Sequence, residues 1–322
     1  MAAPGLKSID LSRLTPGFHR HRFQVRGAGF NAFIWRGGSG PVLLVNGATH
    51  GDEYEGPTLL GRWAAEWRPA RLRGTVVFVP VLNEAAFYAG QRCHPADNGN
   101  LARAFPGGPR GSVTGRLAFL FDTQLLAQCT HYVDLHSGGT GSALLRWTGY
   151  LTRPDAIGKV QHEMAGCFDD YWCWAAPSLP GRTLSAAYRR DLPAIYLECH
   201  GAGGVDPRDL RTLDRGLRRL LSWLGCTGKK GAWQPRPRRV RISNDAEEAH
   251  LQAHHIVPHD GLFIPAARLG QKVIRGRKLG EVLALDGLTR TVIKAEGTGR
   301  IVLIRHRPSV QRGDTVCTLA PI

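Results

Sequence analysis

Three short runs of the sequence carry side chains that can bind a metal ion or move a proton. The first places His50 and Glu53 three residues apart, on a turn that follows an apolar run. The second delivers His136 from the end of another apolar run, and the third does the same for Glu198. Two histidines and one glutamate are the protein ligands of many catalytic zinc sites, which leave a fourth position for water or substrate. The three runs together therefore predict a catalytic zinc site.

Two alternatives stay open beside these runs. Asp134 lies two residues before His136, so on a strand both side chains point to the same face. Asp134 either orients the imidazole of a ligand histidine or caps a nearby loop. Cys199 and His200 offer the residue types of a nucleophile and its base. Adjacent residues of a strand point to opposite faces, however, which argues against that pair.

Apolar runs that alternate with segments of helical spacing must position these side chains. Strands are predicted at residues 41–45, 76–79, 132–135 and 194–197. Helices are predicted at residues 57–67, 112–128, 156–168 and 208–224. This alternation favours an α/β sheet with helices on both faces. Open α/β sheets bind their ligands at the carboxyl ends of the strands, where the three runs lie.

The composition changes along the chain and divides it into three predicted segments. Residues 1–225 hold the alternating strands and helices and form the predicted catalytic domain. Residues 226–245, with lysine, arginine, proline and glycine but few aliphatic side chains, form a predicted linker. Residues 246–322 contain short β runs punctuated by glycine and form a predicted all-β domain. His250, His254, His255 and His259, near the start of this domain, are expected to lie in a solvated segment.

Composition excludes several classes of protein. The chain has 322 residues, of which 43% are hydrophobic and 21% charged, as in an ordinary folded protein with a full core. No stretch approaches the roughly 20 apolar residues of a membrane-spanning helix, so no membrane partner is expected. The seven cysteines form no Cys-x-x-Cys pair, and the first residues lack the apolar core of a secretory signal. Reduced thiols and a cytoplasmic location are therefore expected.

The net charge of +16 raises the question of a polyanionic partner. A basic surface is typical of proteins that bind nucleic acid, membrane surfaces or small anionic substrates. Apart from the run at residues 236–241, the arginines are scattered, and no zinc-finger spacing or RNA-binding aromatic motif accompanies them. We therefore expect a small anionic substrate and no nucleic acid.

Taken together, these motifs resemble the succinylglutamate desuccinylase and aspartoacylase group of the zinc-carboxypeptidase superfamily. The resemblance covers most of the chain and looks closest to the bacterial branch that includes N-acetyl-diaminobutyrate deacetylases. It is carried by the His50–Glu53 run, the segment 83–107, the Asp134–His136 run, Glu198 and the β tail. It implies a zinc-carboxypeptidase-like mixed sheet with helices on both faces, followed by a biotinyl/lipoyl-like half-barrel.

The resemblance also implies roles for individual side chains. His50, Glu53 and His136 would bind one zinc ion per chain, and Glu198 would serve as general base and then general acid. Arg92 would stabilise the oxyanion that forms during attack on the amide. Within the segment 83–107, two further positions, Asn100 and Arg103, are expected to contact the substrate, Arg103 by clamping its carboxylate.

Two residues of that segment depart from the family pattern. Asn100 stands where the family often has aspartate, and Ala102 stands where it has the asparagine that shares carboxylate recognition with the arginine. Neither residue is an expected metal ligand or base, so hydrolysis itself is not affected. The departures concern recognition of an ordinary α-carboxylate.

These observations predict a zinc-dependent amidohydrolase that deacylates an N-acyl amino acid or a related N-acylated amine through a metal-activated water. The alternative within enzymes is a carboxypeptidase-like hydrolase of a peptide or modified peptide. Two less favoured alternatives are a metal-binding pseudoenzyme, which the presence of Glu198 opposes, and a basic protein associated with nucleic acid. The expected partner is a small anionic N-acyl substrate, and assembly into a homo-oligomer remains open.

Overall fold

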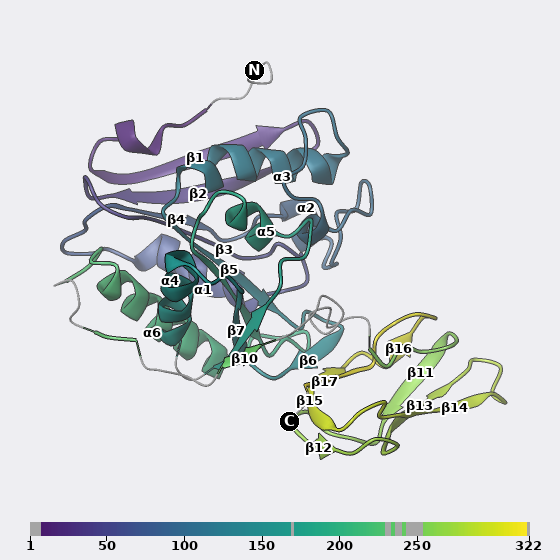
Figure 1. Cartoon of the computed structure of the whole chain (residues 1–322). Coiled ribbons are helices and arrows are strands. Elements are labelled where there is room, and N and C mark those ends of the chain that lie inside the picture. Colours follow the sequence, from purple (N-terminus) through teal and green to yellow (C-terminus); the bar gives the residue numbers. More distant parts are fainter. Residues whose placement is uncertain (1–7, 169–170, 229–232, 236–239, 243–253, 321–322) are drawn as a thin grey trace.

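The chain folds around one large mixed sheet, followed by an antiparallel β region (Figure 1). The computed structural model describes residues 8–168, 171–228, 233–235, 240–242 and 254–320. The nine strands of the large sheet lie in the order β1-β2-β4-β3-β5-β9-β7-β8-β10. Their bounds are β1 (Gly17–Val25), β2 (Ala28–Arg36), β3 (Val42–Asn46), β4 (Thr75–Val79), β5 (His131–Ser137), β7 (Trp147–Leu151), β8 (Trp172–Ala176), β9 (Ala194–Cys199) and β10 (Val240–Ile242).

Helices cover both faces of this sheet, as predicted (Figure 1). The α-helices are α1 (Glu55–Glu66), α2 (Glu84–Tyr88), α3 (Val113–Gln124), α4 (Ala156–Gly166), α5 (Thr183–Tyr188) and α6 (Pro207–Trp223). Three short 3-10 helices complete the set: η1 (Leu11–Arg13), η2 (Leu101–Arg103) and η3 (Leu126–Gln128). The four strands and four helices predicted in the catalytic segment are all present.

Side chains of the central strands point alternately to the two faces of the sheet, and each face has its own hydrophobic core. Leu43 and Val45 of β3 pack into the core formed with α1, α4 and α6. Leu44, between them, packs into the opposite core with α3 and α5. Because successive side chains of a strand point to opposite faces, a continuous apolar run is what a strand covered on both faces requires. The central strands are therefore held rigidly, and they carry the candidate site at their carboxyl ends.

The C-terminal part is all β and entirely antiparallel, as predicted. One sheet has the order β14-β13-β11-β16, and in the other β12 and β17 flank β15. The bounds are β11 (Gly261–Pro265), β12 (Lys272–Val273), β13 (Lys278–Leu283), β14 (Arg290–Lys294), β15 (Gly299–Arg305), β16 (Ser309–Val310) and β17 (Cys317–Ala320). A short strand of the preceding segment, β6 (Ser142–Leu144), pairs with β15 and ties the two parts together.

The structure adds two observations to the predicted division of the chain. The linker predicted at 226–245 contains β10, which pairs in parallel with β8 at the edge of the large sheet. The boundaries of the three segments remain predictions. The expectation of a solvated histidine segment is wrong for His255, which is buried and contacts the carbonyl oxygen of Cys317 and the amide of Glu296. His250 lies outside the described residues.

Two further expectations concern the membrane and the thiols. Among the residues described, no helix combines the length and the apolar character needed to span a bilayer. The seven cysteines all lie within the described residues, and none of them forms a disulfide there.

Candidate metal centre and its cavity

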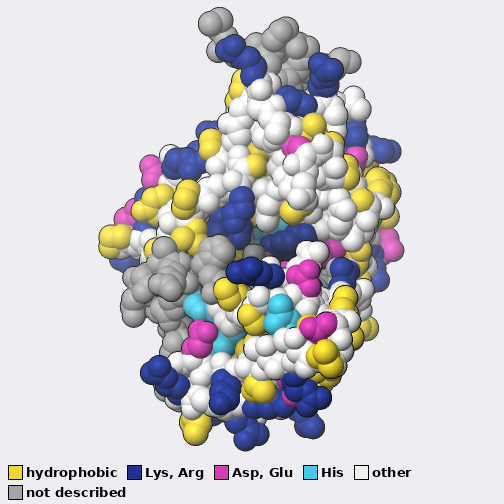
Figure 2. All heavy atoms as spheres, turned by 90° about the vertical axis from the view of Figure 1, so that its right-hand side faces the viewer, with side chains coloured by type: hydrophobic (Ala, Val, Ile, Leu, Met, Phe, Trp, Pro, Cys, Tyr) yellow, Lys and Arg dark blue, Asp and Glu magenta, His cyan; other side chains and the backbone are white. Residues whose placement is uncertain are grey.

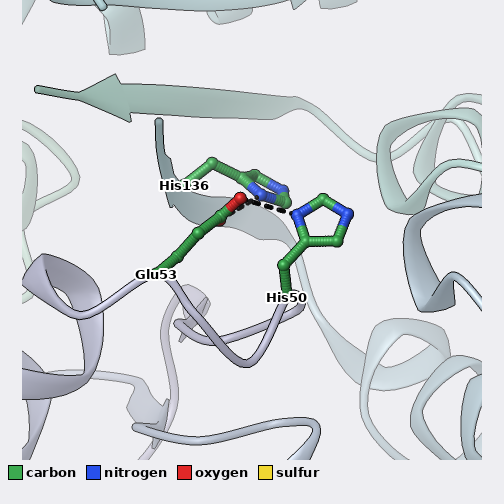
Figure 3. A group of neighbouring side chains, drawn as sticks. All are labelled: His50, Glu53 and His136. Atoms are coloured by element: carbon green, nitrogen blue, oxygen red, sulfur yellow. Dashed lines mark hydrogen bonds and ion pairs between the residues drawn. The ribbon is translucent and has the colours of Figure 1, made fainter. Parts of the chain in front are cut away.

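The structure brings His50, Glu53 and His136 together (Figure 3). His50 and Glu53 lie on the loop between β3 and α1, and His136 lies near the end of β5. Nδ1 of His50 is 2.7 Å from one carboxylate oxygen of Glu53, and Nδ1 of His136 is 2.9 Å from the other. One ligand atom from each residue lies within 4.8 Å of the others. Both imidazoles thus turn Nδ1 toward the Glu53 carboxylate, and the three side chains lie close enough to share one metal ion.

A glycine permits the loop that carries two of these residues. A Cβ on Gly51 would lie 2.0 Å from the backbone carbon of Ala86, in α2. Only glycine allows this close approach of the loop to the helix. The first motif therefore needs the glycine between His50 and Glu53 for packing, independently of any chemistry.

The far nitrogen of each histidine is held by an oxygen acceptor. Nε2 of His136 lies 2.9 Å from Oδ2 of Asp134, and Nε2 of His50 lies 3.1 Å from Oδ1 of Asn100. An acceptor at Nε2 keeps the proton there and leaves Nδ1 free to bind a metal. The chemistry of the donor set therefore fits a divalent cation at this position.

Asp134 is the most heavily engaged of these side chains. Its carboxylate is fully buried. Oδ1 accepts hydrogen bonds from Asn46 (2.9 Å) and Thr49 (3.0 Å), and Oδ2 accepts one from Thr183 (2.5 Å). Together with His136 it therefore joins β3, the β3–α1 loop, β5 and the start of α5. Both alternatives left open by the sequence have a counterpart in the geometry: Oδ2 contacts the ligand histidine, and Oδ1 holds the β3–α1 loop through Thr49.

Burial and mutual attraction shift the pKa values within the centre. Burial opposes ionisation of Glu53, but His50 and His136 hold the pKa of its carboxyl well below the usual range. Burial and the positive charge of Arg92 lower the pKa of His50, despite the neighbouring Glu53. His136 differs: burial opposes its protonation, but the carboxylates of Asp134 and Glu53 raise its pKa above the usual range. A metal ion that binds here must therefore displace a proton from His136, whereas His50 already favours the uncharged imidazole that metal binding requires.

Glu198 faces the same cavity from the neighbouring strand. In the parallel pairing of β5 with β9, His136 lies opposite Glu198, and Asp134 lies opposite Tyr196. All four side chains therefore point to one side of the sheet. Burial raises the pKa of Glu198 to about 8, although the nearby His136 acts in the opposite direction. The following residue, Cys199, is buried on the other side against Tyr171, so Cys199 and His200 do not form a pair at this site.

Three arginines line the cavity, whose volume is about 120 Å³. Nη1 of Arg92 lies 3.3 Å from Glu53, and Nη1 of Arg103 donates to the carbonyl oxygen of Ala102 at 3.0 Å. Partial burial and the charges of Arg182 and Arg92 lower the pKa of Arg103 to about 10. The Nε of Arg182 is buried and has no hydrogen-bond partner among the described residues. The three guanidinium groups make this end of the cavity suited to an anion.

The residues that line the cavity differ in part from those predicted from the sequence. Asn100, expected to contact substrate, is not among the described residues that line the cavity, and it contacts His50 instead. The sequence reasoning missed Arg182 and Tyr196, which do line it. Tyr196 lies two residues before Glu198, and that spacing on a strand was a usable signal. Arg182 lies in the loop before α5, where no periodicity indicates the direction of a side chain.

Solved structures of other proteins match this fold over nearly the whole chain. A succinylglutamate desuccinylase from Silicibacter sp. TM1040 is 26% identical, with a TM-score of 0.86, covering 100% of this chain and 99% of its own. The ectoine utilization protein EutE (DoeB) from Ruegeria pomeroyi, in a product-bound structure, is 27% identical with a TM-score of 0.84 and covers 98% of both chains.

Sequence comparison points to the same family. The N-alpha-acetyl-L-2,4-diaminobutyric acid deacetylase of Halomonas elongata is 30% identical over 291 residues, which are 88% of this chain and 83% of the relative. Residues 39–224 match the family model of the succinylglutamate desuccinylase/aspartoacylase catalytic domain, and they include the three metal-binding residues and Glu198. The chain, a deacylase-type hydrolase with a His-Glu-His metal-binding triad, therefore belongs to the succinylglutamate desuccinylase/aspartoacylase family.

Proposed function

We propose that this protein is a zinc-dependent amidohydrolase that deacylates an N-acyl amino acid or a related N-acylated amine. The observation that carries the proposal is the convergence of His50, Glu53 and His136 beside Glu198, in a cavity that also contains three arginines. Three protein ligands with one open position are typical of catalytic zinc sites.

The proposed chemistry assigns proton transfer to Glu198. When bound by His50, Glu53 and His136, zinc would supply Lewis acidity toward the amide carbonyl and lower the pKa of water from 15.7 to about 7. Glu198 would accept the proton of the attacking water and later donate it to the leaving amine. Burial raises the pKa of this carboxyl to about 8 without a metal, and a neighbouring cation would lower it toward neutrality, where general acid–base catalysis works best.

The other polar residues have supporting roles in this proposal. Arg92, next to Glu53, would stabilise the developing oxyanion. Arg103 and Arg182 would hold an anionic group of the substrate. Asp134 and Asn100 would orient His136 and His50 through their Nε2 atoms, a role in which Asn100 does not itself bind substrate.

The relatives support an N-acyl substrate. The relative from Halomonas elongata is named as a deacetylase of an N-acetylated amino acid, N-alpha-acetyl-L-2,4-diaminobutyric acid. No observation on this chain favours the peptide substrate of the carboxypeptidase-like alternative.

On one face of the molecule, Lys and Arg side chains are spread among acidic ones and border a central hollow, without forming a continuous stripe (Figure 2). A cytoplasmic location and a homo-oligomer remain predictions.

The test combines metal content with turnover. We expect about one zinc ion per chain, loss of activity with a chelator, and release of amine from at least one N-acyl amino acid. His136→Ala should lose both zinc and activity. The control is His162→Ala, because His162 contacts Tyr150 away from the cavity. Stoichiometric zinc in single variants of all three ligands would refute the metal site, and an inactive zinc-loaded wild type would refute the reaction.

A further inference from the structure

The cavity has a second lining that the proposed chemistry leaves unused. Besides the metal centre and the arginines, its walls include six large apolar side chains: Leu144, Trp147, Leu151, Leu179, Leu184 and Leu303. An N-acetylated amino acid with a charged side chain offers nothing to pack against such a surface. The part of the substrate that reaches these walls is therefore expected to be apolar.

The apolar lining is built where the two parts of the chain meet. Leu144 of β6 and Leu303 of β15 are direct partners in the antiparallel pair that joins them. Both belong, with Trp147 of β7, to one buried cluster, against which Leu179 packs. Because these side chains are held by strand pairing and by each other, the apolar lining is preformed and does not need a substrate to order it.

The apolar lining adjoins the reacting groups. Trp147 lies opposite Glu198 in the pairing of β7 with β9. The indole nitrogen of Trp147 donates a hydrogen bond to the hydroxyl of Tyr196 at 3.3 Å, so its ring is fixed in place. A group bound to the amide that Glu198 serves would therefore contact the indole and the leucines around it.

We propose that the substrate carries a bulky apolar group, aliphatic or aromatic, that packs against Leu144, Trp147, Leu179 and Leu303, while its anionic group is held by the arginines. The inference rests on the proposed deacylase function and names its substrate class. Ala102, which lines the cavity in place of the larger family asparagine, leaves additional room for such a group.

The apolar group can belong to either half of the substrate, and a panel of four substrates distinguishes the halves. N-acetyl-aspartate carries no apolar group. N-acetyl-phenylalanine carries one on the amine half, N-hexanoyl-aspartate carries one on the acyl half, and N-hexanoyl-phenylalanine carries both. With the zinc-loaded full-length enzyme, we expect at least one of the apolar substrates to exceed N-acetyl-aspartate roughly tenfold or more in kcat/KM, since even one methylene in an apolar pocket is worth ~10–200-fold.

A matched pair of variants tests the lining itself. Leu179 and Leu145 are both half-buried and pack against the same cluster, but only Leu179 lines the cavity. Leu179→Gln should lower the ratio of kcat/KM for the preferred apolar substrate to kcat/KM for N-acetyl-aspartate about tenfold or more, whereas Leu145→Gln should leave this ratio unchanged.

The outcomes separate the two proposals. If N-acetyl-aspartate is hydrolysed as well as the apolar substrates, the apolar inference is overturned and the deacylase function stands. An unchanged preference in Leu179→Gln also overturns it. If the zinc-loaded enzyme hydrolyses no substrate of the panel or of a wider set of N-acyl amino acids, the deacylase function fails and the inference fails with it.

Discussion

Replacement of Asp134 by asparagine tests whether this residue prepares His136 to bind a metal. The carboxylate accepts from four donors, which are Asn46, Thr49, Thr183 and His136. An asparagine has one oxygen and one amino group, so one of the two oxygen positions becomes a donor. If the amino group replaces Oδ1, it faces the amide donor of Asn46. If it replaces Oδ2, it faces His136 and favours the tautomer with the proton on Nδ1.

Both orientations carry a cost that can be measured. A buried donor left without an acceptor costs about 1–3 kcal/mol of folding free energy. A wrong tautomer at a metal ligand, or the loss of its oriented partner, typically weakens metal binding ~10–100-fold, or about 1.4–2.8 kcal/mol. In either orientation His136 also loses the negative charge beside its Nε2. We therefore expect Asp134→Asn to bind zinc at least about tenfold more weakly, measured by competition with a chromophoric chelator, and to unfold at lower urea concentration without metal.

The matched control is Asp209→Asn. Asp209 is equally buried and also accepts from several donors, namely Arg146, Tyr171 and the amide of His200. It contacts none of the metal ligands, so its replacement should lower stability and leave zinc affinity unchanged. The reasoning is refuted if Asp134→Asn binds zinc as tightly as wild type, or if Asp209→Asn weakens binding equally.

Three further substitutions test other parts of the site. Glu198→Gln should keep its zinc, measured by elemental analysis, and lose ~10²–10⁴-fold in kcat, because general base catalysis is worth that much. Ala102→Asn should raise kcat/KM for small N-acetyl α-amino acids roughly tenfold or more, because a hydrogen bond to a charged group is worth about 1.5–3 kcal/mol. Asp97→Asn should lower the free energy of unfolding at neutral pH. Although burial opposes ionisation of Asp97, hydrogen bonds from Thr114 lower its carboxyl pKa from 3.8 to about 2, so the stabilisation is present above pH 4 and disappears as pH falls through 2.

Each of these predictions has a clear contrary result. An active Glu198→Gln enzyme would mean that another group is the base. If wild type already prefers small N-acetyl amino acids and Ala102→Asn changes nothing, the alanine does not set specificity. The free energies of unfolding of wild type and Asp97→Asn, measured in urea at several pH values, should differ less and less below pH 4. A difference that stays constant with pH would contradict the assigned pKa.

The convergence of the metal centre was predictable from sequence because it depends on strand ends. β3, β5 and β9 are adjacent and parallel, so His50, His136 and Glu198, which follow or end them, must meet at one edge of the sheet. The apolar runs that revealed these strands are continuous because both faces are buried. The strand starts and ends predicted from these runs agree with the structure to within two residues.

Elements with a different pattern escaped prediction. β1 buries only Phe23 fully among its nine residues, so it carries no apolar run. β10 is three residues long, and its place at the sheet edge depends on pairing with β8, which is distant in sequence. The cavity wall is set by tertiary contacts as well: Leu303 reaches the site only because β15 pairs with β6. Such features depend on pairing partners that local spacing does not encode.

The pairing of β6 with β15 has a consequence for how the chain can be divided. Without residues 299–305, β6 would present unpaired amide and carbonyl groups, as well as the side chain of Leu144, to water. Exposed strand edges of this kind promote association between molecules. A shortened protein ending near residue 225 would therefore be prone to aggregate and would have an open cavity wall. Limited proteolysis in the connecting region, by contrast, should leave the two fragments associated through this strand pair.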